Sequence, residues 1–492
     1  MKKIYLPLLF SVLLAGSFSA ASAFKITPPL GHSIRIHVNG IKDTACFLGN
    51  YYGDKQYVQD TVKVNSKGWF AFEGKDTLPG GIYLIVMPDK KYFEMLVTED
   101  QFFTLETDTL DFVGKMKIDG SEENKLFYEY LKFITPRGKQ VDSLKKVITA
   151  LSIHDSSGTR SSEIKKDESE KIVAQISSID SQVMNYKKQV LREHPKTFLA
   201  QTFRAMSETE TPPPPILSNG RPDSLFKFYY YRQHFWDSID FRDDRLIRTP
   251  IFHNKLKQYI QSLTPQIPDS INAAADLVVG KARASKELFK YVVWYITITY
   301  ERSNYMGMDA VFVHMVENYY TADQAFWADS SLIYRINDRA RILKPLLLGK
   351  VAPDLVMKDT SDVYRGLHDV KARYTIMAFW DPDCPHCKKA MPVLDSLYQI
   401  VKKQKVEVYA ICTEVEMDKW KSYIKEHKLE WINVADPTFK TNARSIYDVT
   451  STPIFYLLNE KKEILAKKLD VHPLADMVSR LLKEDAAKTD QH

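Results

Sequence analysis

The residues best suited to chemistry are two cysteines separated by two residues, in the segment Cys384-Pro385-His386-Cys387. They follow an apolar run at 374–380, typical of a strand covered on both faces, and they precede apolar residues at helical spacing over 391–401. A thiol reacts as its thiolate, and an ordinary thiol pKa of about 8.5 leaves few thiolates at neutral pH. The unpaired N–H groups and the dipole at a helix N-terminus stabilise an anion, so the first cysteine is the better placed nucleophile.

The spacing lets Cys387 reach back and close a disulfide with Cys384. It predicts thiol–disulfide exchange, in which Cys384 forms a mixed disulfide with a partner and Cys387, the more buried thiol, resolves it. Pro385 suits the first helical turn because it has no N–H to satisfy. A protonated His386 would lower the pKa of Cys384 and Asp383 would raise it. These opposing charges leave the redox direction open between oxidase, reductase and isomerase.

A zinc site is the main alternative for two cysteines at this spacing. It needs a second pair of ligands, and the sequence has no other CxxC and no closely spaced cluster of His and Cys. The sequence also has no HExxH motif and no GxxxxGK[ST] phosphate loop. We therefore expect no metal and no cofactor other than the redox-active disulfide of Cys384 and Cys387.

Strands and helices alternate around the cysteines from residue 353 onward. Strands are expected at 374–380, 406–412, 431–434, 454–458 and 464–469, and helices after the cysteines, at 418–427 and at 473–483. About seventy residues beyond the cysteines, Thr452-Pro453 stands directly before a strand. The pattern predicts an α/β domain with a mixed sheet and helices on both faces.

Residues 350–485 resemble the TlpA/ResA-like branch of the thioredoxin superfamily, extracytoplasmic thiol:disulfide oxidoreductases often labelled redoxin or AhpC/TSA-like. The matching segments are 351–355, Phe379-Trp380, 384–387, Met391-Pro392 and 447–455. The resemblance implies a thioredoxin fold in which Cys384 is the attacking thiol and Cys387 the resolving thiol. It also implies that Pro453 is a cis-proline packed against the disulfide, and that the backbone of Thr452 pairs with substrate.

Three features depart from the pattern of that family. Many relatives carry a buried acid that moves protons to the resolving thiol, at the positions held here by Ala378 or Ala390. Asp383 stands where Trp is common, which changes the surface presented to a partner. The Pro-His pair between the cysteines is that of strongly oxidising DsbA-type proteins, so the reductase role usual in this branch does not follow directly.

Two regions precede the α/β domain. The sequence of residues 24–120 alternates short strand-like runs with Gly, Asn, Asp and Pro, which favours an antiparallel sandwich or barrel, and we expect a β-sandwich. Residues 121–348 change to helical spacing and predict an all-α region. The chain is thus expected to be multidomain: a signal peptide at 1–23, domains at 24–120, 121–348 and 349–485, and a flexible tail at 486–492.

Several stretches of the helical region have two interpretations. The polar stretch 156–171 is either a loop or an extended, solvated helix, and the run of four prolines at 212–215 begins a non-helical connector reaching 222. Aromatic side chains crowd the segment 226–236, and Tyr and Met recur over 305–320. Both groups fit either a peptide-docking surface or a helical core, and we favour the core.

The N-terminus indicates export. Lys2 and Lys3 precede an apolar run at 8–15 and a small-residue cleavage site, Ala21-Ser22-Ala23. The apolar run is shorter than the ~20 residues that a membrane span requires. We expect cleavage near Ala23, no membrane span afterwards, and a periplasmic location.

Composition narrows the choice of partner. The 492 residues carry 68 basic and 62 acidic side chains, a nearly balanced formal charge of +6 that gives no case for nucleic acid. Four cysteines are too few for a disulfide scaffold, and the two outside the motif, Cys46 and Cys412, are expected to be buried thiols. The expected partners are protein thiols and disulfides of the envelope and an unknown redox partner.

The leading hypothesis is a periplasmic thiol:disulfide oxidoreductase whose upstream regions position a partner. The alternative is an envelope binding or scaffold protein in which the thioredoxin-like domain is not catalytic. A thiol peroxidase ranks lower, because a peroxiredoxin site needs Thr or Ser three residues before its cysteine and Asp381 stands there.

Overall fold

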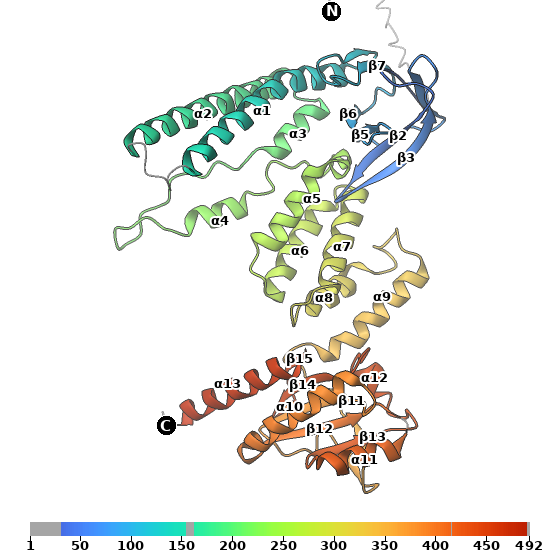
Figure 1. Ribbon diagram of the computed structural model, residues 1–492, viewed down its shortest axis with the longest axis vertical. Helices are drawn as coiled ribbons and strands as arrows, with labels where there is room; N and C mark the ends of the chain where they lie inside the picture. Colours follow the sequence, from blue (N-terminus) through green and yellow to red (C-terminus); the bar gives the residue numbers. More distant parts are fainter. Residues whose placement is uncertain (1–30, 154–161, 415, 490–492) are drawn as a thin grey trace, which may run out of the picture.

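The computed structural model describes residues 31–153, 162–414 and 416–489. The expected signal peptide and residues 490–492 of the expected tail lie outside the described residues. Figure 1 shows the N-terminal strands and a long helical hairpin at one end, a group of helices in the middle, and an α/β domain that ends the chain at the other end. No helix of the described segments is long and apolar enough to cross a membrane.

The N-terminal strands form two four-stranded sheets, ordered β4-β1-β7-β8 and β3-β2-β5-β6. The strands are β1 (His32–Asn39), β2 (Ala45–Tyr52), β3 (Lys55–Lys63), β4 (Trp69–Gly74), β5 (Gly81–Val86), β6 (Tyr92–Val97), β7 (Phe102–Asp108) and β8 (Lys117–Asp119). The expected pair of sheets is confirmed, but β1 and β7 run parallel, so the arrangement is not wholly antiparallel. The chain leaves the first sheet to form β5 and β6 before it returns as β7, a crossover long enough for parallel pairing.

Helices make up the central region, as expected. They are α1 (Glu122–Ile153), α2 (Ser162–Glu193), α3 (Phe198–Met206), α4 (Phe226–Gln233), α5 (Pro250–Lys257), α6 (Pro268–Ala282), α7 (Lys286–Glu301), α8 (Asp309–Tyr319) and α9 (Ser330–Leu343). Helices α1 and α2 form the long hairpin (Figure 1). The stretch 156–171 is helical from Ser162 onward, while 154–161 lies outside the described residues. Residues 207–225 are non-helical, as the prolines require.

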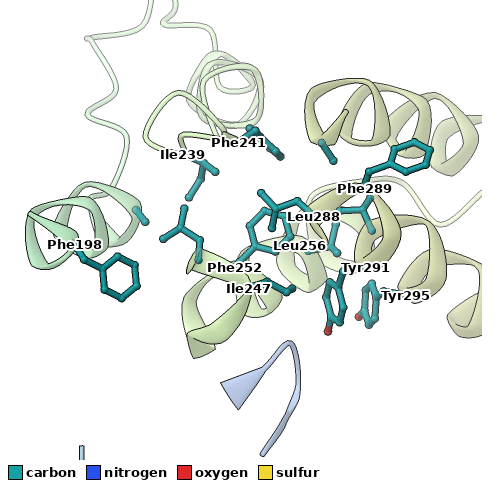
Figure 2. Packing of buried hydrophobic residues seen from close by; sticks show 14 of the residues in the cluster. Phe198, Ile239, Phe241, Ile247, Phe252, Leu256, Leu288, Phe289, Tyr291 and Tyr295 are labelled. Atoms are coloured by element: carbon teal, nitrogen blue, oxygen red, sulfur yellow. The ribbon is translucent and has the colours of Figure 1, made fainter. Parts of the chain in front are cut away.

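One hydrophobic core joins the sheets to the helices. Its buried side chains form one continuous cluster that extends from Ile34 in β1 to Leu343 in α9. Figure 2 shows part of it, where Phe198 of α3, Leu256 of α5 and Leu288 of α7 lie around the same interior. The chain therefore changes from strands to helices near residue 120, but the same hydrophobic core continues on both sides of that expected boundary.

The aromatic segment 226–236 is only partly core, which corrects our interpretation. Phe235 and Trp236 are buried, but α4 contains no buried residue, and Tyr229 is 59% exposed. Phe226, Phe228, Tyr229 and Tyr230 contact neighbouring rings along the helix, while Tyr231 packs against the core and the ring of Phe235. The second group divides in the same way, because Tyr305 and Met306 are exposed whereas its remaining members, Met308, Met315, Tyr319 and Tyr320, are buried.

The C-terminal domain is built on a seven-stranded mixed sheet, ordered β10-β9-β13-β12-β11-β14-β15. Its elements are β9 (Val356–Asp359), β10 (Tyr364–Gly366), β11 (Tyr374–Trp380), α10 (Pro385–Val401), β12 (Val406–Cys412), α11 (Met417–His427), β13 (Ile432–Ala435), α12 (Ala443–Ile446), β14 (Ile454–Asn459), β15 (Ile464–Leu469) and α13 (Val471–Thr489). Strand β11 lies between β12, which is parallel to it, and β14, which is antiparallel. The expected α/β architecture is confirmed.

The two faces of this sheet are covered differently. Alternate residues of β11, such as Ala378 and Phe379, enter two separate hydrophobic cores. The long helices α10, α11 and α13 all contribute to the core containing Ala378. The other core is closed by short α12 and by the segment 346–372, so helices lie on both faces, as expected, but the long ones share one face. Successive right-handed crossovers from β11 to β12 to β13 place α10 and α11 on the same face.

The C-terminus is more regular than expected. Helix α13 continues to Thr489, so residues 486–489 are helical and not part of a tail.

Cys46 and Cys412 are buried free thiols in different cores, as expected for interior cysteines.

Buried ion pairs join the helical region to the α/β domain. Asp448, in the loop before β14, is 7% exposed and pairs with Arg339 of α9 and with Lys468 of β15. Lys467, also in β15, pairs with Asp309 of α8 and donates to the carbonyl of Leu346 at 2.6 Å. Burial alone raises the pKa of Asp448, but the hydrogen bonds from Arg339 and Lys468 outweigh it and hold that pKa below its ordinary value.

Replacing Asp448 should loosen this junction. We expect Asp448→Asn to lower the free energy of unfolding by about 2 kcal/mol, below the range for a fully buried pair because Arg339 and Lys468 are partly exposed. Because the pKa of Asp448 is lower in the folded protein, Asp448 stabilises the fold fully above its unfolded pKa of about 3.9. This stabilisation is lost as the pH falls through the pKa that Asp448 has in the folded protein. Denaturant unfolding at several pH values measures both effects.

The exposed pair of Asp338 and Arg341 on α9 supplies the control. Asp338→Asn should cost less than about 1 kcal/mol at any pH, as is usual for surface pairs. The prediction is contradicted if both variants lose the same free energy of unfolding, or if the loss in Asp448→Asn is as large at pH 3 as at neutral pH.

Candidate active site

The turn after β11 places the two cysteines. All seven residues of β11 are buried, and α10 begins directly after Cys384, which is the N-cap residue. The Asp381 carboxylate accepts the N–H of Asp383 at 2.7 Å, and the Asp381 carbonyl accepts the N–H of Cys384 at 3.2 Å. Pro385 occupies the first helical turn, where the missing N–H costs nothing. The expectation that the CxxC opens a helix after a buried strand is confirmed.

Cys387 lies beneath the helix start. It is fully buried, and its Sγ accepts the backbone N–H of Asp381 at 3.4 Å. Burial raises the pKa of Cys387 to about 12, and the hydrogen bond from Asp381 offsets only part of that rise. This thiol is protonated at neutral pH.

Cys384 has a contrasting environment. It is half-buried, and its thiol donates to the Thr452 carbonyl at 3.3 Å. Partial burial tends to raise the pKa of Cys384, but hydrogen bonding to the Cys387 N–H, to Thr452 and to the His386 N–H outweighs it, so the pKa is lowered. The site therefore pairs an accessible thiol of low pKa with a buried thiol of high pKa, as the helix N-terminus predicts.

The loop before β14 closes the site from the other side. Its Thr452–Pro453 peptide bond is cis, as the family resemblance implied. Beside this loop lies a cleft of about 570 Å³. The side chains lining it come from the start of α10, the proline loop and the start of α13: His386, Lys389, Ala390, Ser451, Thr452, Pro453, Asp470, Val471 and His472.

The predicted site residues come together around this cleft. Thr452 contacts Cys384 directly, and Pro453 and His386 line the cleft. Pro385 is exposed beside them. His386 lowers the pKa of Cys384 through its backbone N–H, a route different from the ring charge that the sequence suggested.

Lys419 is a neighbour of the site that sequence reasoning missed. Its ammonium group lies 2.9 Å from the Asp383 carboxylate and 3.0 Å from that of Glu416. The hydrogen bond from Lys419 holds the pKa of Asp383 below its ordinary value, so Asp383 is ionised but its charge is offset locally. Thirty-six residues and one strand separate the partners, and no pattern in the sequence joins them.

The two positions at which many relatives carry a buried acid near the resolving cysteine hold alanine here. Ala378 and Ala390 are buried and apolar, as read from the sequence. The ring of Tyr423 of α11 is tilted by 56° against that of Trp380, with ring centroids 5.1 Å apart. Burial raises the pKa of Tyr423, and the charge of the Cys387 sulfur raises it further. No pattern in the sequence pointed to it.

The two remaining cysteines, Cys46 and Cys412, are poor nucleophiles. Burial raises the pKa of Cys46 to about 11 and that of Cys412 to about 12. Both are therefore protonated at neutral pH and poorly suited to attack a disulfide.

A buried strand, a CxxC at the following helix start and a cis-proline loop facing the first cysteine define a dithiol site of the thioredoxin superfamily. Comparison with known proteins agrees. Residues 348–467 match the AhpC/TSA family, while 32–127 and 161–336 match two domains of unknown function, DUF4369 and DUF5106.

Curated relatives match the same C-terminal region. A thiol-disulfide oxidoreductase ResA of Bacillus cereus is 25% identical over 148 residues, which are 30% of this chain and 77% of the relative. ResA of Bacillus subtilis is 26% identical over 117 residues, which are 24% of this chain and 64% of the relative. The C-terminal domain is therefore TlpA/ResA-like, a member of the thioredoxin superfamily that is similar to thiol-disulfide oxidoreductases.

Solved structures also match parts of the chain. A thioredoxin-like protein from Bacteroides caccae is 20% identical, with a TM-score of 0.42, and covers 56% of this chain and 99% of its own. A domain of a possible thiol-disulfide isomerase from Cytophaga hutchinsonii is 38% identical, with a TM-score of 0.27, and covers 30% of this chain and 98% of its own.

The lowered pKa of Cys384 predicts its pH profile. Alkylation of the reduced protein by iodoacetamide should modify Cys384 first, with a rate that rises to a midpoint below the pH of about 8.5 typical of a free thiol. Cys387 should stay unmodified in the native protein because its pKa is about 12 and it is buried. Mass spectrometry of timed samples identifies the modified residue. A midpoint at or above 8.5, or earlier modification of Cys387, would show that the assignment is wrong.

The ion pair of Asp383 and Lys419 predicts opposite effects of its two members. Lys419→Ala leaves the Asp383 carboxylate uncompensated and should raise the pKa of Cys384, whereas Asp383→Asn should lower it. Both groups are half exposed, so we expect changes of a few tenths of a unit that vanish at about 1 M salt. The alkylation profile measures these changes.

Lys421→Ala is the matched control, because Lys421 is an exposed lysine on the same helix. It should leave the pKa of Cys384 unchanged. A shift of the same sign in Lys419→Ala and Asp383→Asn would rule out the charge argument.

Proposed function

We propose that this chain is a periplasmic thiol:disulfide oxidoreductase that exchanges the dithiol or disulfide of Cys384 and Cys387 with partner proteins through a mixed disulfide. The observation that carries the proposal is the contrast between an accessible Cys384 of lowered pKa and a buried Cys387 of raised pKa. The similarity of the C-terminal domain to thiol-disulfide oxidoreductases supports it.

In the reducing direction, the Cys384 thiolate attacks one sulfur of a client disulfide. The client S–S bond breaks, a bond between Cys384 and the client forms, and the second client sulfur leaves as a thiolate that takes up a proton. Cys387 then loses its proton and attacks the Sγ of Cys384, which releases the first client sulfur. The client gains two electrons and the Cys384–Cys387 pair loses two.

The oxidising direction reverses each step. A reduced client attacks the Cys384–Cys387 disulfide, and an envelope redox partner restores that disulfide afterwards. No further cofactor is required, because both electrons and both protons pass through the two sulfurs. The N–H of Asp381 and the side chains of Thr452 and Cys384 are hydrogen-bonding groups beside Cys387 when its charge changes.

Client binding is assigned to the cleft beside Pro453. An extended segment can lie along the backbone at Thr452, whose carbonyl already accepts a hydrogen bond from Cys384. Residues 24–348 would position the partner, since buried ion pairs hold them against the catalytic domain. The N-terminal export signal supports the periplasm as the location of the exchange.

Reduction of insulin by dithiothreitol, followed as turbidity, tests the proposal on the full chain. We expect wild type to accelerate it at least tenfold over the uncatalysed rate and Cys384→Ser to abolish the acceleration, because the attacking sulfur is lost. Cys387→Ser should accumulate a mixed disulfide that non-reducing electrophoresis detects.

Cys46→Ala controls for the loss of a thiol remote from the site and should retain the wild-type rate, since Cys46 lies in the other core. Equal rates in wild type and Cys384→Ser would reject the enzyme and favour the binding or scaffold protein.

A further inference from the structure

A second hollow lies far from the cysteines, where the tip of the β2–β3 hairpin meets α7. Figure 1 shows the hairpin tip reaching the central helices. The hollow measures about 170 Å³. Its lining comes from the hairpin and from one turn of α7: Tyr52, Asp54, Tyr57, Lys290, Tyr291 and Trp294.

The walls of the hollow are aromatic, and hydrogen bonds hold the two inner rings, Tyr52 and Tyr291, in place. Tyr291 is buried, meets Tyr52 edge-on at 5.8 Å and lies 5.7 Å from Trp294 between ring centroids. The Tyr291 hydroxyl is bonded to Nδ1 of His253 at 2.8 Å, and the Tyr52 hydroxyl donates to Glu287 at 3.0 Å. Figure 2 shows the rings of Tyr291 and Tyr295 side by side, with their hydroxyls toward the hairpin.

The hairpin is held closely enough to keep the hollow in shape. Gly53, at its tip, has a φ of +61°, and its N–H donates to the Ile247 carbonyl at 2.8 Å. A Cβ at this position would stand 2.1 Å from the Tyr291 hydroxyl, so only glycine permits the contact. The binding surface is therefore formed before any ligand arrives, which lowers the entropic cost of binding.

Two aromatic side chains remain open to solvent at the rim. Tyr57 is 50% exposed and Trp294 is 37% exposed, although both line the hollow. Rings of this kind offer apolar faces on which a flat ligand stacks.

Opposite charges flank these rings. Asp54 supplies a carboxylate and Lys290 an ammonium group. Within the described residues neither group is held in an ion pair, so both are available to a ligand. A carboxylate only accepts hydrogen bonds and an ammonium group only donates them.

These properties select one class of ligand. The ring faces would attract an organic cation, but Lys290 repels it, and Asp54 repels an anion. The hollow is smaller than the roughly 300–1,000 Å³ of sites for drug-sized molecules, so it admits a single ring. A neutral ring with an apolar C–H face and several hydroxyls satisfies the aromatic walls and both charges.

We propose that this hollow is a carbohydrate-binding site that takes one sugar ring, stacked on Trp294 and Tyr57 and hydrogen-bonded to Asp54 and Lys290. The site is independent of the thiol chemistry. It would let the upstream regions bind a glycan or a glycosylated client.

Isothermal titration of the full chain with neutral sugars tests the proposal. The probes are glucose, galactose, N-acetylglucosamine and their disaccharides maltose, lactose and chitobiose. We expect at least one probe to saturate, with affinity reduced about tenfold by Trp294→Ala and by Tyr57→Ala, as the loss of a stacking ring predicts. Asp54→Asn and Lys290→Met should each weaken the same probe severalfold.

Tyr334→Ala is the matched control, because Tyr334 is a 72% exposed ring on α9 outside the hollow. It should leave the affinity unchanged, and the thermal midpoint of every variant verifies folding. The proposal fails if none of the probes saturates at up to 50 mM, a concentration about fiftyfold above a millimolar Kd. It also fails if the ring variants bind as tightly as wild type, or if choline binds the hollow in place of a sugar.

Discussion

The site depends on one electrostatic contrast within a single helical turn. Cys384 caps α10 at the edge of a cleft, where backbone N–H groups outweigh the cost of partial burial. Cys387, one turn later, lies under the helix among apolar side chains and receives one N–H, from Asp381. The same strand, turn and helix thus produce two thiols of very different acidity. The proposed order of attack, first by Cys384 and then by Cys387, rests on that difference.

Local sequence patterns were sufficient to predict this arrangement. The apolar run of β11, the position of Pro385 and the place of Thr452-Pro453 before a strand each reflect short-range constraints on backbone and burial. The cores of both halves were predictable for the same reason. Where periodicity failed, as in α4, most rings of an eight-residue helix contact one another, and only Tyr231 packs against the core.

Contacts between distant segments were not predictable. Lys419 meets Asp383 only because α10 and α11 pack on the same face of the sheet, which follows from the crossovers and not from any motif. Tyr423 reaches the neighbourhood of Cys387 by the same packing. The hollow at the β2–β3 hairpin requires a turn in the first hundred residues to meet a helix near residue 291, and single-residue patterns carry no information on such a meeting.

The joint between α9 and the α/β domain has a mechanical consequence. Residues 349–352 run along β15 with paired backbone hydrogen bonds, from Gly349 to Ile464 and from Ala352 to Lys462, while Asp448 and Lys467 are clamped from α9 and α8. This is a rigid coupling and not a swinging tether. Under the proposed function, a client bound by residues 24–348 would therefore have to present its disulfide at a fixed position relative to that region.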